Sequence, residues 1–403
     1  MNSLALNVIV GQGEADLLDR CLDSFEVNKY FDEIVIVNTS TDLEIEVLAQ
    51  KYGAKYREFK WESEDFPHGN FAGARNRAVE NTESQFIMWL DSDDVLLDKY
   101  IEQWEKLVSV VKDENHAHVK MYTMPYALTV RDDGSPVSSF TRERIFRSDV
   151  MKWRNPVHEM IDIAWSPAEI GEFNNIAITH LPNKPKYASA VRNLKILEHE
   201  YFTKNNQDIQ VKYFLGRDYL LFGETEKGRK IFDEMIENME VSWPQLRDMC
   251  VDMIWIYGYG NHNTRPRLSD LKMENERVIE KYARLALNFS NKISETYCVL
   301  GDLYFRRNQL DAAERMYLQA MKQDKNGGKR IQSALFYGEI PLWRLSLLYY
   351  EKHEYEKSLL YSRQWLKCTN NAGSTLALRN TVINYLMEEN KKLSNQEETV
   401  CSG

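Results

Sequence analysis

The sequence predicts an α/β domain with a parallel sheet, followed by a domain made almost wholly of helices. Two observations predict this. Short apolar runs alternate with helical patterns over roughly the first hundred residues, at the spacing of strand–helix–strand units. Beyond residue 185 the chain becomes rich in Leu, Tyr, Glu and Lys, and a helical repeat appears. The chain has 403 residues and 43% hydrophobic content, which suffices for two cores. We therefore expect domains at 1–185 and 186–403.

The α/β domain is predicted from elements that follow one another in a regular order. Strands are expected at 4–10, 33–38 and 55–59 and in the apolar run 86–90, and helices at 17–25, 43–52, 71–80 and near 95–111. Gly53 is expected to end the second helix. Strand, helix, strand and helix at this spacing predict parallel strands joined by right-handed crossovers.

Three carboxylates follow the apolar run 86–90 within four positions: Asp91, Asp93 and Asp94. Open α/β sheets bind ligands beyond the carboxyl ends of their strands. Crowded like charges repel each other, so a cation or a donor-rich ligand would stabilise them. Such oxygen ligands suit Mg²⁺ or Mn²⁺, which complete their shells with substrate phosphates. The alternative is a solvated acidic turn before the next helix, and these residues alone do not decide between the two.

Short motifs at the predicted strand ends add to this picture. They are the first strand and loop at 8–14, the second strand and loop at 32–42, the segment 71–76, Asp91-Ser92-Asp93, Arg144-Ile145-Phe146-Arg147 and Val157-His158-Glu159. Together they resemble the family 2 glycosyltransferases, whose GT-A fold is a Rossmann-like nucleotide-diphospho-sugar transferase domain. The last two motifs resemble the branch typified by lipopolysaccharide-core and peptide S-glycosyltransferases, in which helical repeats follow that domain. The resemblance covers about residues 1–185, and the combination is specific, whereas Asp-x-Asp alone is not.

The resemblance implies a donor site and a divalent cation, Mn²⁺ or Mg²⁺. Asp91 would contact the nucleoside, Asp93 would bind the cation that bridges the donor diphosphate, and Arg75 would lie near the donor. The expected donor-binding residues are Val10, Gly11, Glu14, Asn38, Ser40, Arg75, Asn76, Asp91 and Ser92. His158 or His180 would supply a further metal contact through a neutral imidazole. For His180, in the apolar stretch 176–180, a structural role is the stronger alternative.

Sugar transfer also needs a base that deprotonates the acceptor. Glu159 is the first candidate, and Asp162 and Asp94 stand behind it. The alternative for the pair His158-Glu159 is a surface position at the end of a strand.

Two positions depart from the family pattern, and both concern the nucleotide base. The second strand ends in Asn38 where the family usually has Asp, and the first loop reads Gly11-Gln12-Gly13-Glu14 where Asn before Glu is common. An Asn removes a charge that could accept from a ring N–H or a ribose hydroxyl. A UDP-type donor is still expected. The pair Gly11-x-Gly13 is not a dinucleotide fingerprint, because it lacks the third glycine and the acidic ribose contact.

The helical half contains a repeat of the tetratricopeptide type. The clearest copy has Tyr297, Leu300, Gly301, Tyr304, Ala313, Tyr317 and Ala320; fainter copies have Leu215, Gly216, Tyr219, Gly228 and Phe232, and Leu345, Ser346, Tyr349 and Ser358. Each hairpin needs neighbours to cover its apolar face, so the units are expected to stack into a short solenoid. A hinge is expected at 181–185, loops at 258–263 and 325–330, and a polar frayed tail from 390.

Two roles fit this helical half. It could recognise an extended acceptor on a concave surface, or form a homodimer with exposed tyrosines and Trp343 or Trp365 as anchors. For most of these aromatic residues we prefer the simpler interpretation that they form the core between helices.

Composition restricts the partners and the location. The formal net charge of −10 argues against broad electrostatic binding of nucleic acid. The basic cluster of Arg142, Arg144, Arg147, Lys152 and Arg154 leaves a local contact open, although a solvated strand edge with donor contacts is preferred. The apolar runs are too short for a transmembrane segment, and no leader pattern starts the chain. Five scattered cysteines fit a reducing compartment, so we expect a cytoplasmic protein, in the host cytoplasm if it is phage-encoded.

The resemblance therefore implies an inverting, metal-dependent glycosyltransferase of the hexosyltransferase type, with a UDP-sugar as the favoured donor. Peptide or glycan acceptors are favoured, and a small molecule or a modified DNA base stays open. The alternative is a non-catalytic repeat scaffold or interaction module with a degenerate GT-A domain, prompted by Asn38 and the altered first loop. The presence of Asp91, Asp93, Arg75 and Glu159 argues against that alternative.

Overall fold

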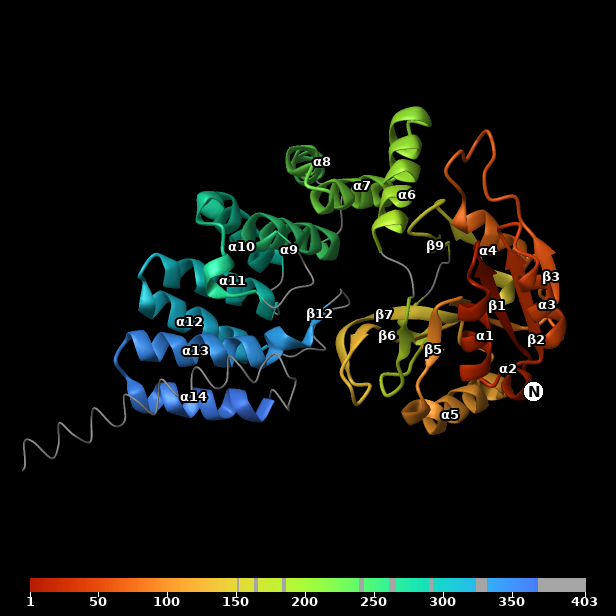
Figure 1. Cartoon of the computed structure of the whole chain (residues 1–403), viewed down its shortest axis with the longest axis horizontal. Coiled ribbons are helices and arrows are strands. Elements are labelled where there is room, and N and C mark those ends of the chain that lie inside the picture. Colours follow the sequence, from red (N-terminus) through yellow and green to blue (C-terminus); the bar gives the residue numbers. More distant parts are fainter. Residues whose placement is uncertain are drawn as a thin grey trace, which may run out of the picture. The chain divides into compact units, whose positions relative to one another are not determined.

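The structure is a computed structural model that describes residues 1–150, 152–162, 166–182, 186–238, 243–260, 266–289, 293–323 and 332–368. The described chain divides into two compact units. The first holds the α/β domain with helices α6 (Lys186–Glu198), α7 (Ile209–Leu221) and α8 (Thr225–Glu237). The second holds the remaining helices (Figure 1). The predicted domain limits of 1–185 and 186–403 remain a prediction, since 183–185 lie outside the described residues.

The α/β domain is built on one mixed sheet. Its strands are β1 (Leu4–Val10), β2 (Glu33–Asn38), β3 (Lys55–Glu58), β4 (Phe86–Asp91), β5 (Asp94–Leu96), β6 (Met121–Val130), β7 (Pro136–Arg147), β10 (Ile170–Glu172) and β11 (Ile178–His180). The order is β3-β2-β1-β4-β7-β6-β11-β5, with β10 beside β6. Strands β1 to β4 are mutually parallel, and β7 runs antiparallel to β4. The predicted parallel strands are thus confirmed, and the sheet continues into an antiparallel part.

Helices cover this sheet and complete its core. They are α1 (Ala15–Ser24), α2 (Val27–Tyr30), α3 (Glu44–Lys51), α4 (Phe71–Val79) and α5 (Ile101–Lys112). Strand β1 is buried along its whole length, which explains why all of its residues except Asn7 are apolar. On α5, the buried Trp104 packs edge-on against Phe25 with ring centroids 5.4 Å apart. The predicted segments therefore meet in one hydrophobic core, as an α/β sheet requires.

The predicted start of the helix near 95–111 was wrong. Helix α5 begins at Ile101, and Asp94–Leu96 instead form the short strand β5, antiparallel to β11. Val95 and Leu96 are buried in this strand pair. The partner strand is some eighty residues away in sequence, so local periodicity could not distinguish this strand from the start of the helix.

A small hairpin, β8 (Trp153–Arg154) with β9 (Met160–Ile161), lies in the chain between β7 and β10 of the main sheet. Its connecting loop contains two residues with positive φ, Asn155 at 67° and His158 at 51°. The backbone N–H of Phe71, at the start of α4, donates to the Pro156 carbonyl at 2.9 Å. The loop thereby lies against the N-terminal end of α4.

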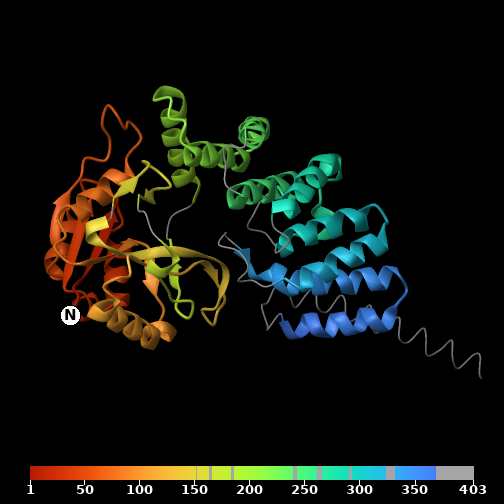
Figure 2. The same cartoon turned by 180° about the vertical axis from the view of Figure 1, so that it is seen from behind.

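Helices α6 and α7 pack on this loop. Val157, from the loop, shares one hydrophobic cluster with Ile196 and Leu197 of α6 and Val211 of α7, and Phe71 packs against that cluster. The first helices after the sheet are therefore part of the same core as the loop (Figure 2).

The second unit consists of paired helices: α9 (Trp243–Tyr259), α10 (Glu276–Phe289), α11 (Ser294–Arg306), α12 (Leu310–Met321), α13 (Glu339–Glu351) and α14 (Tyr355–Cys368). The predicted repeat falls on successive helices. A Cβ added to Gly301 of α11 would lie 2.3 Å from the Tyr317 ring of α12. Ser358 of α14 donates to the Ser346 carbonyl of α13 at 2.8 Å. The prediction of helical hairpins that cross closely at small residues is confirmed.

The aromatic residues considered as dimer anchors are buried within this unit. Trp343 and Trp365 are 8% and 2% exposed, and their rings stack with centroids 6.3 Å apart. They form interhelical core, as preferred from the sequence. The loop predicted at 258–263 was placed too early, because Gly258 and Tyr259 still belong to α9. Residues 261–263, 325–330, 183–185 and the tail from 390 lie outside the described residues, so the structure expected there stays a prediction. Among the described residues, none of the helices combines the length and apolar character that crossing a bilayer requires.

Candidate functional site

The carboxyl ends of three parallel strands meet at one edge of the sheet. The strand register places Ile9 beside Asp91 and Val10 beside Asn38. The chain passes from β1 to β2 and β3 on one side, and β4 lies on the other side of β1. Such a change of direction opens a crevice beyond the strand ends, where open α/β sheets bind ligands. Several of the residues predicted to bind the donor follow these strand ends.

The three aspartates after β4 have different surroundings. Asp91 forms an ion pair with Arg75, with Oδ1 2.6 Å from Nη2. Asp94 is fully buried, accepts from the Asp91 backbone N–H, and pairs with the equally buried Arg144 at 2.9 Å. Burial by itself raises the pKa of Asp91, but the charges of Arg75 and Arg144 outweigh it and lower that pKa to about 2. Burial, together with the charge of Asp91, raises the pKa of Asp94 to about 6 despite Arg144. Asp94 is therefore part of the buried framework.

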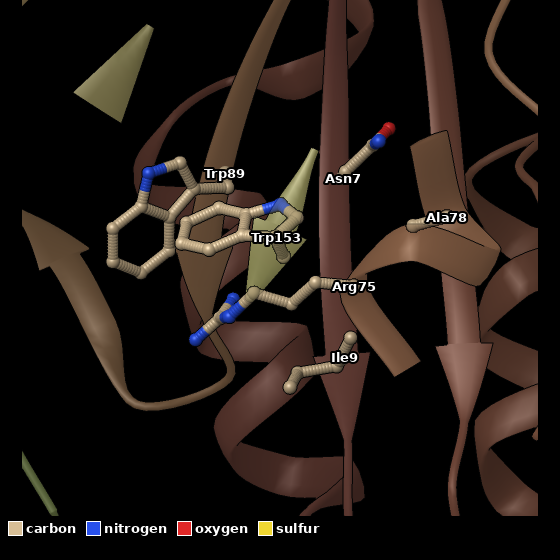
Figure 3. Close-up of a pocket in the computed structure, with 6 residues that line it drawn as sticks. All are labelled: Asn7, Ile9, Arg75, Ala78, Trp89 and Trp153. Atoms are coloured by element: carbon tan, nitrogen blue, oxygen red, sulfur yellow. The ribbon is translucent and has the colours of Figure 1, made fainter. Parts of the chain in front are cut away.

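Arg75 joins the strand end to the β8–β9 loop. Besides Asp91, it binds Glu159, with Nε 2.6 Å from Oε1. The guanidinium also lies over the rings of Trp89 and Trp153, 4.3 Å and 5.1 Å from their centroids. Figure 3 shows the arginine with both indoles beside a small pocket, which Asn7, Ile9 and Ala78 also line. Both the charge and the flat faces of this arginine are thus used to hold Asp91 and Glu159 in one arrangement.

Asp93, Asp94 and His180 each offer one potential ligand atom, and these atoms lie within 4.8 Å of one another. His180 Nδ1 is 3.2 Å from Asp93 Oδ1 and 3.0 Å from the Tyr126 hydroxyl. The Asp94 Oδ1 atom is buried and has no hydrogen-bond partner. A buried carboxylate oxygen without a partner is costly unless a cation or donor approaches it. Carboxylates suit Mg²⁺ or Mn²⁺, and imidazole is also a metal ligand, so these residues fit a divalent cation.

His180 has a second effect on this cluster. Burial alone would lower its pKa, but the charges of Asp93, Asp94 and Asp91 outweigh burial and raise it. The carboxylates therefore favour the protonated form of the imidazole, and a metal bound through His180 would have to displace that proton.

Glu14 links the first loop to Ser92, which lies between Asp91 and Asp93. Its Oε2 accepts from the Gly11 backbone N–H and from the Ser92 hydroxyl, both at 2.9 Å. A side chain on residue 11 would crowd this carboxylate, since a Cβ there would lie 3.3 Å from Glu14 Oε2. Of the predicted donor residues, Gly11, Glu14 and Ser92 are thus brought together by direct contacts.

Asn38 is buried and its amide is used within its own loop. Its Oδ1 accepts from the backbone N–H and hydroxyl of Ser40, both at 2.8 Å. Its Nδ2 donates to the Asp42 carbonyl at 3.0 Å and to the Tyr56 hydroxyl at 3.1 Å. A carboxylate could not make the second pair of bonds as a donor. The departure from the family's usual Asp therefore has a structural explanation at this position.

Asn76 also binds backbone. Its Nδ2 donates to the Trp153 carbonyl at 3.0 Å, and its Oδ1 accepts from the Trp153 N–H at 2.8 Å. These two bonds fix β8 on α4, so Asn76 positions the hairpin that carries the loop.

Two other predicted residues lie apart from the Asp93 cluster. His158 stacks on Phe214 of α7, with centroids 4.0 Å apart, and its Nε2 is 3.7 Å from Asp218 Oδ2. Burial lowers the pKa of His158. Asp162 is exposed at the end of β9 and pairs with Arg154 at 2.9 Å. Of the two histidines expected near the metal, His180 alone joins the cluster found among the described residues.

Sequence reasoning missed the part played by aromatic residues. Trp89 lies in an apolar strand and reads as core, and Trp153 follows a basic segment with no periodic pattern. Three arginines, Arg75, Arg142 and Arg144, lie over the Trp89 ring at 4.3, 5.0 and 4.0 Å. The sequence did hold one sign of this role: the arginines at 142–154 lie close to Trp153 in the chain, and arginines near a tryptophan favour cation–π contacts.

Comparison with known proteins agrees with this architecture. Residues 8–161 match the family model described as Glycosyl transferase family 2. The resemblance to that family is thus confirmed for this part of the chain. Over 163 residues the chain is 28% identical to the TPR repeat-containing protein Synpcc7942_0270 of Synechococcus elongatus. That match covers 40% of the chain and 36% of the relative, so it spans little more than a third of that protein.

Solved structures similar to the chain include S. aureus TarS 1-349, with a TM-score of 0.32 and 11% identity over 92% of this chain and 93% of that one. Another is glucosyl-3-phosphoglycerate synthase from Mycobacterium tuberculosis, in complex with Mn²⁺, UDP and glucosyl-3-phosphoglycerate. Its TM-score is 0.33, with 13% identity over 52% of this chain and 82% of that one. The fold assignment above comes from the strand order and the family match.

Proposed function

We propose that the protein is an inverting glycosyltransferase that moves a sugar from a nucleotide-diphosphate donor, a UDP-sugar first, to a nucleophilic acceptor. The observation that carries the proposal is the Arg75 bridge from Asp91 to Glu159, beside the cluster of Asp93, Asp94 and His180. Asp91 on the donor side, the candidate base Glu159 and the candidate metal site thus lie near one another. They lie at the sheet edge where the strand order changes direction, in a domain that matches the glycosyltransferase family model.

The donor would lie beyond the ends of β1, β2 and β4. Asp91 and Ser92 follow β4, while Glu14 holds the first loop against Ser92. Val10, Asn38 and Ser40 border the same edge from β1 and β2. Glu14, Asn38 and Arg75 are held by partners within the protein, so the wall of the donor site is ordered before any ligand arrives, which lowers the entropy cost of binding.

Asp93, Asp94 and His180 would hold the divalent cation, Mn²⁺ or Mg²⁺. When bound, it supplies Lewis-acid stabilisation of the negative charge on the departing diphosphate. The protein's own part is to keep oxygen ligands close together and oriented. Arg144 and the Asp91 N–H do this for Asp94, and the Tyr126 hydroxyl does it for His180.

Glu159 would be the base that accepts the acceptor's proton. Arg75 fixes the orientation of its carboxylate through Nε, and Phe71 holds the loop backbone at Pro156. A base must reach the reacting hydroxyl or thiol within hydrogen-bond distance, and a carboxylate held in one orientation near the donor side supports this role for Glu159. Asp162, exposed and paired with Arg154, is the second candidate.

For the acceptor we favour a peptide or a glycan, recognised in part by the helical repeats. Stacked hairpins provide extended surfaces of the kind that bind such partners. A modified nucleobase remains the third choice, because three members of the basic cluster are already engaged: Arg144 with Asp94, Arg147 with Asp149, and Arg154 with Asp162. A homodimer through the helical unit is part of the same proposal.

A melting experiment tests this function. The protein should melt at a higher temperature with Mn²⁺ and UDP together than with either alone, because the cation and the diphosphate complete each other's binding. The same experiment is repeated with the other common nucleotide diphosphates. If none of them, with Mn²⁺ or Mg²⁺, changes the melting temperature, the non-catalytic scaffold is the better description.

A further inference from the structure

Helix α6 places one arginine next to the proposed active site. Arg192 precedes Ile196 by one helical turn, so the two share a face. Ile196 is 3% exposed and packs in the cluster that includes Val157, two residues before Glu159. Arg192 is thereby turned towards the loop that carries the candidate base.

The Arg192 guanidinium rests on two aromatic rings. Its Cζ lies 4.7 Å from the Phe71 centroid and 5.8 Å from the Trp61 centroid. The two rings meet edge to face at 4.7 Å. Gly69, with φ of +109°, leaves room for the indole, since a Cβ there would lie 2.1 Å from it. Aromatic faces hold a guanidinium in place while its N–H groups stay available.

The charges that act on Arg192 come from both sides of the site. Burial lowers the pKa of Arg192, and the carboxylates of Glu14 and Glu159 oppose that effect. Among the described residues, its hydrogen bonds go to the neighbouring Asn193 Oδ1, at 3.3 and 3.2 Å, and no carboxylate lies within ion-pair distance. Within the described part of the chain, Arg192 is therefore a half-buried cation without a paired anion, and carboxylates of both the first loop and the base loop act on it.

Two other arginines of the site already bind carboxylates. Arg75 binds two carboxylates and Arg144 is buried against Asp94. Neither can offer a two-pronged contact to a ligand without giving up an ion pair, which is costly for buried charges. Arg192 has no such ion pair to lose among the residues that the structure describes.

We propose that Arg192 is a substrate-binding residue of this site: supported by Trp61 and Phe71, it binds an oxyanion of the substrate, a phosphate or carboxylate, between Glu14 and Glu159. The inference rests on the proposed function and deepens it. Helix α6, the first helix after the sheet, then supplies Arg192 to the site. Without α6, the substrate-binding site would be incomplete. The oxyanion belongs either to the donor diphosphate or to an anionic acceptor.

The test compares Arg192→Ala, Arg192→Lys and wild type by titration calorimetry. The first arm measures UDP in the presence of Mn²⁺. The second measures inorganic sulfate, as a mimic of an acceptor anion, with the protein saturated in UDP and Mn²⁺. Loss of a charge-assisted, two-pronged contact should weaken the affected ligand at least about tenfold in Arg192→Ala, with Arg192→Lys in between. Weaker UDP assigns Arg192 to the donor; unchanged UDP with loss of sulfate assigns it to the acceptor.

Lys195→Ala is the matched control, because Lys195 is an exposed cation on the same helix. It should keep both affinities and the melting temperature of the wild type. If Arg192→Ala binds UDP and sulfate as the wild type does, the proposal is overturned while the proposed function stands. If the wild type binds no nucleotide diphosphate, both fall together. A variant with a lowered melting temperature and an equal loss for Arg192→Lys would show a merely structural role, which also overturns the proposal.

Discussion

Arg75 and Glu159 are 84 positions apart in the chain, yet their side chains meet at 2.6 Å, Nε to Oε1, and both are almost fully buried. The same guanidinium holds Asp91 at 2.6 Å. One arginine therefore couples the end of β4, where the donor is expected, to the loop that carries the candidate base.

Glu159→Gln tests the role of this loop directly. The amide keeps the size of the side chain and can still accept from Arg75, but it cannot take a proton from the acceptor. We expect turnover to fall by about 10²–10⁴-fold, with UDP and Mn²⁺ affinity close to that of the wild type. Single-turnover kinetics and calorimetry measure the two quantities. An equal loss of binding and turnover would make Glu159 a structural residue, and a larger loss in Asp162→Asn would move the base to Asp162.

Asp93→Ala should abolish the dependence of nucleotide binding on the cation. Asp93 lies beside His180 and supplies an oxygen to the proposed metal cluster. We expect UDP with Mn²⁺ to leave the melting temperature of this variant unchanged, and EDTA to stop wild-type turnover until Mn²⁺ is restored. The exposed Asp98, changed to Ala, is the control that should behave as the wild type. A full UDP and Mn²⁺ response in Asp93→Ala would remove this residue from the metal site.

His158 should make stability depend on pH. Burial lowers its folded-state pKa below the usual value of 6.5, so the unfolded chain binds the proton more readily. The stability that the neutral imidazole contributes is present above pH 6.5 and is lost as the pH falls through the lower, folded-state pKa. His158→Asn tolerates the positive φ and removes this titration. Its melting temperature should therefore decline less than that of the wild type between about pH 7.5 and 5.5.

His353 provides the matched control for that experiment. It is exposed and also has a positive φ, 60°. His353→Asn should keep the slope of the wild type, measured by scanning fluorimetry in buffers of equal ionic strength. Parallel curves for wild type and His158→Asn would rule out His158 as the source of the slope.

Gly301→Ala should destabilise the helical unit. The added methyl would lie 2.3 Å from Tyr317 Cε1, and Tyr317 is fully buried and cannot move aside. We expect a loss of about 1–3 kcal/mol in the free energy of unfolding, measured by urea denaturation with circular dichroism. Gly338→Ala is the control, because a Cβ there has no neighbour within 4 Å. Equal stability of the two variants would mean that α11 and α12 do not cross as closely as described.

Asp302→Asn should lower the free energy of unfolding more than Gly301→Ala does. Both oxygens of Asp302 bind the fully buried Arg344, at 2.7 and 2.9 Å, and Tyr317 donates to Oδ1. Removing this charge leaves Arg344 uncompensated, at a cost of about 3–5 kcal/mol in unfolding free energy. Asp311→Asn removes an exposed partner of Lys352 and should therefore change the free energy of unfolding far less. Urea denaturation of both variants measures the difference, and a small effect at Asp302 would show that water reaches Arg344.

Elements with a local signature were predictable. Strand β1 is apolar except for Asn7 because it is buried on both faces, and Gly301 with Tyr317 keeps the spacing of a helical hairpin. Strand β5 was mistaken for the start of a helix, since only its pairing with the distant β11 makes it a strand. That pairing sets His180 opposite Asp94, which no spacing in the sequence reveals.

By itself, the sequence determined the parallel strands β1 to β4, most of their helices and the helical hairpins, and which residue types of a sugar-transfer site are present, because these depend on local periodicity and on short motifs. Only the tertiary structure decided which of those residues meet. It joined Arg75 to both Asp91 and Glu159, separated His158 from Asp93, and set Arg192 over Trp61 and Phe71. Contacts of this kind arise from the packing of distant segments, where burial makes each unpaired charge costly and so selects its partner.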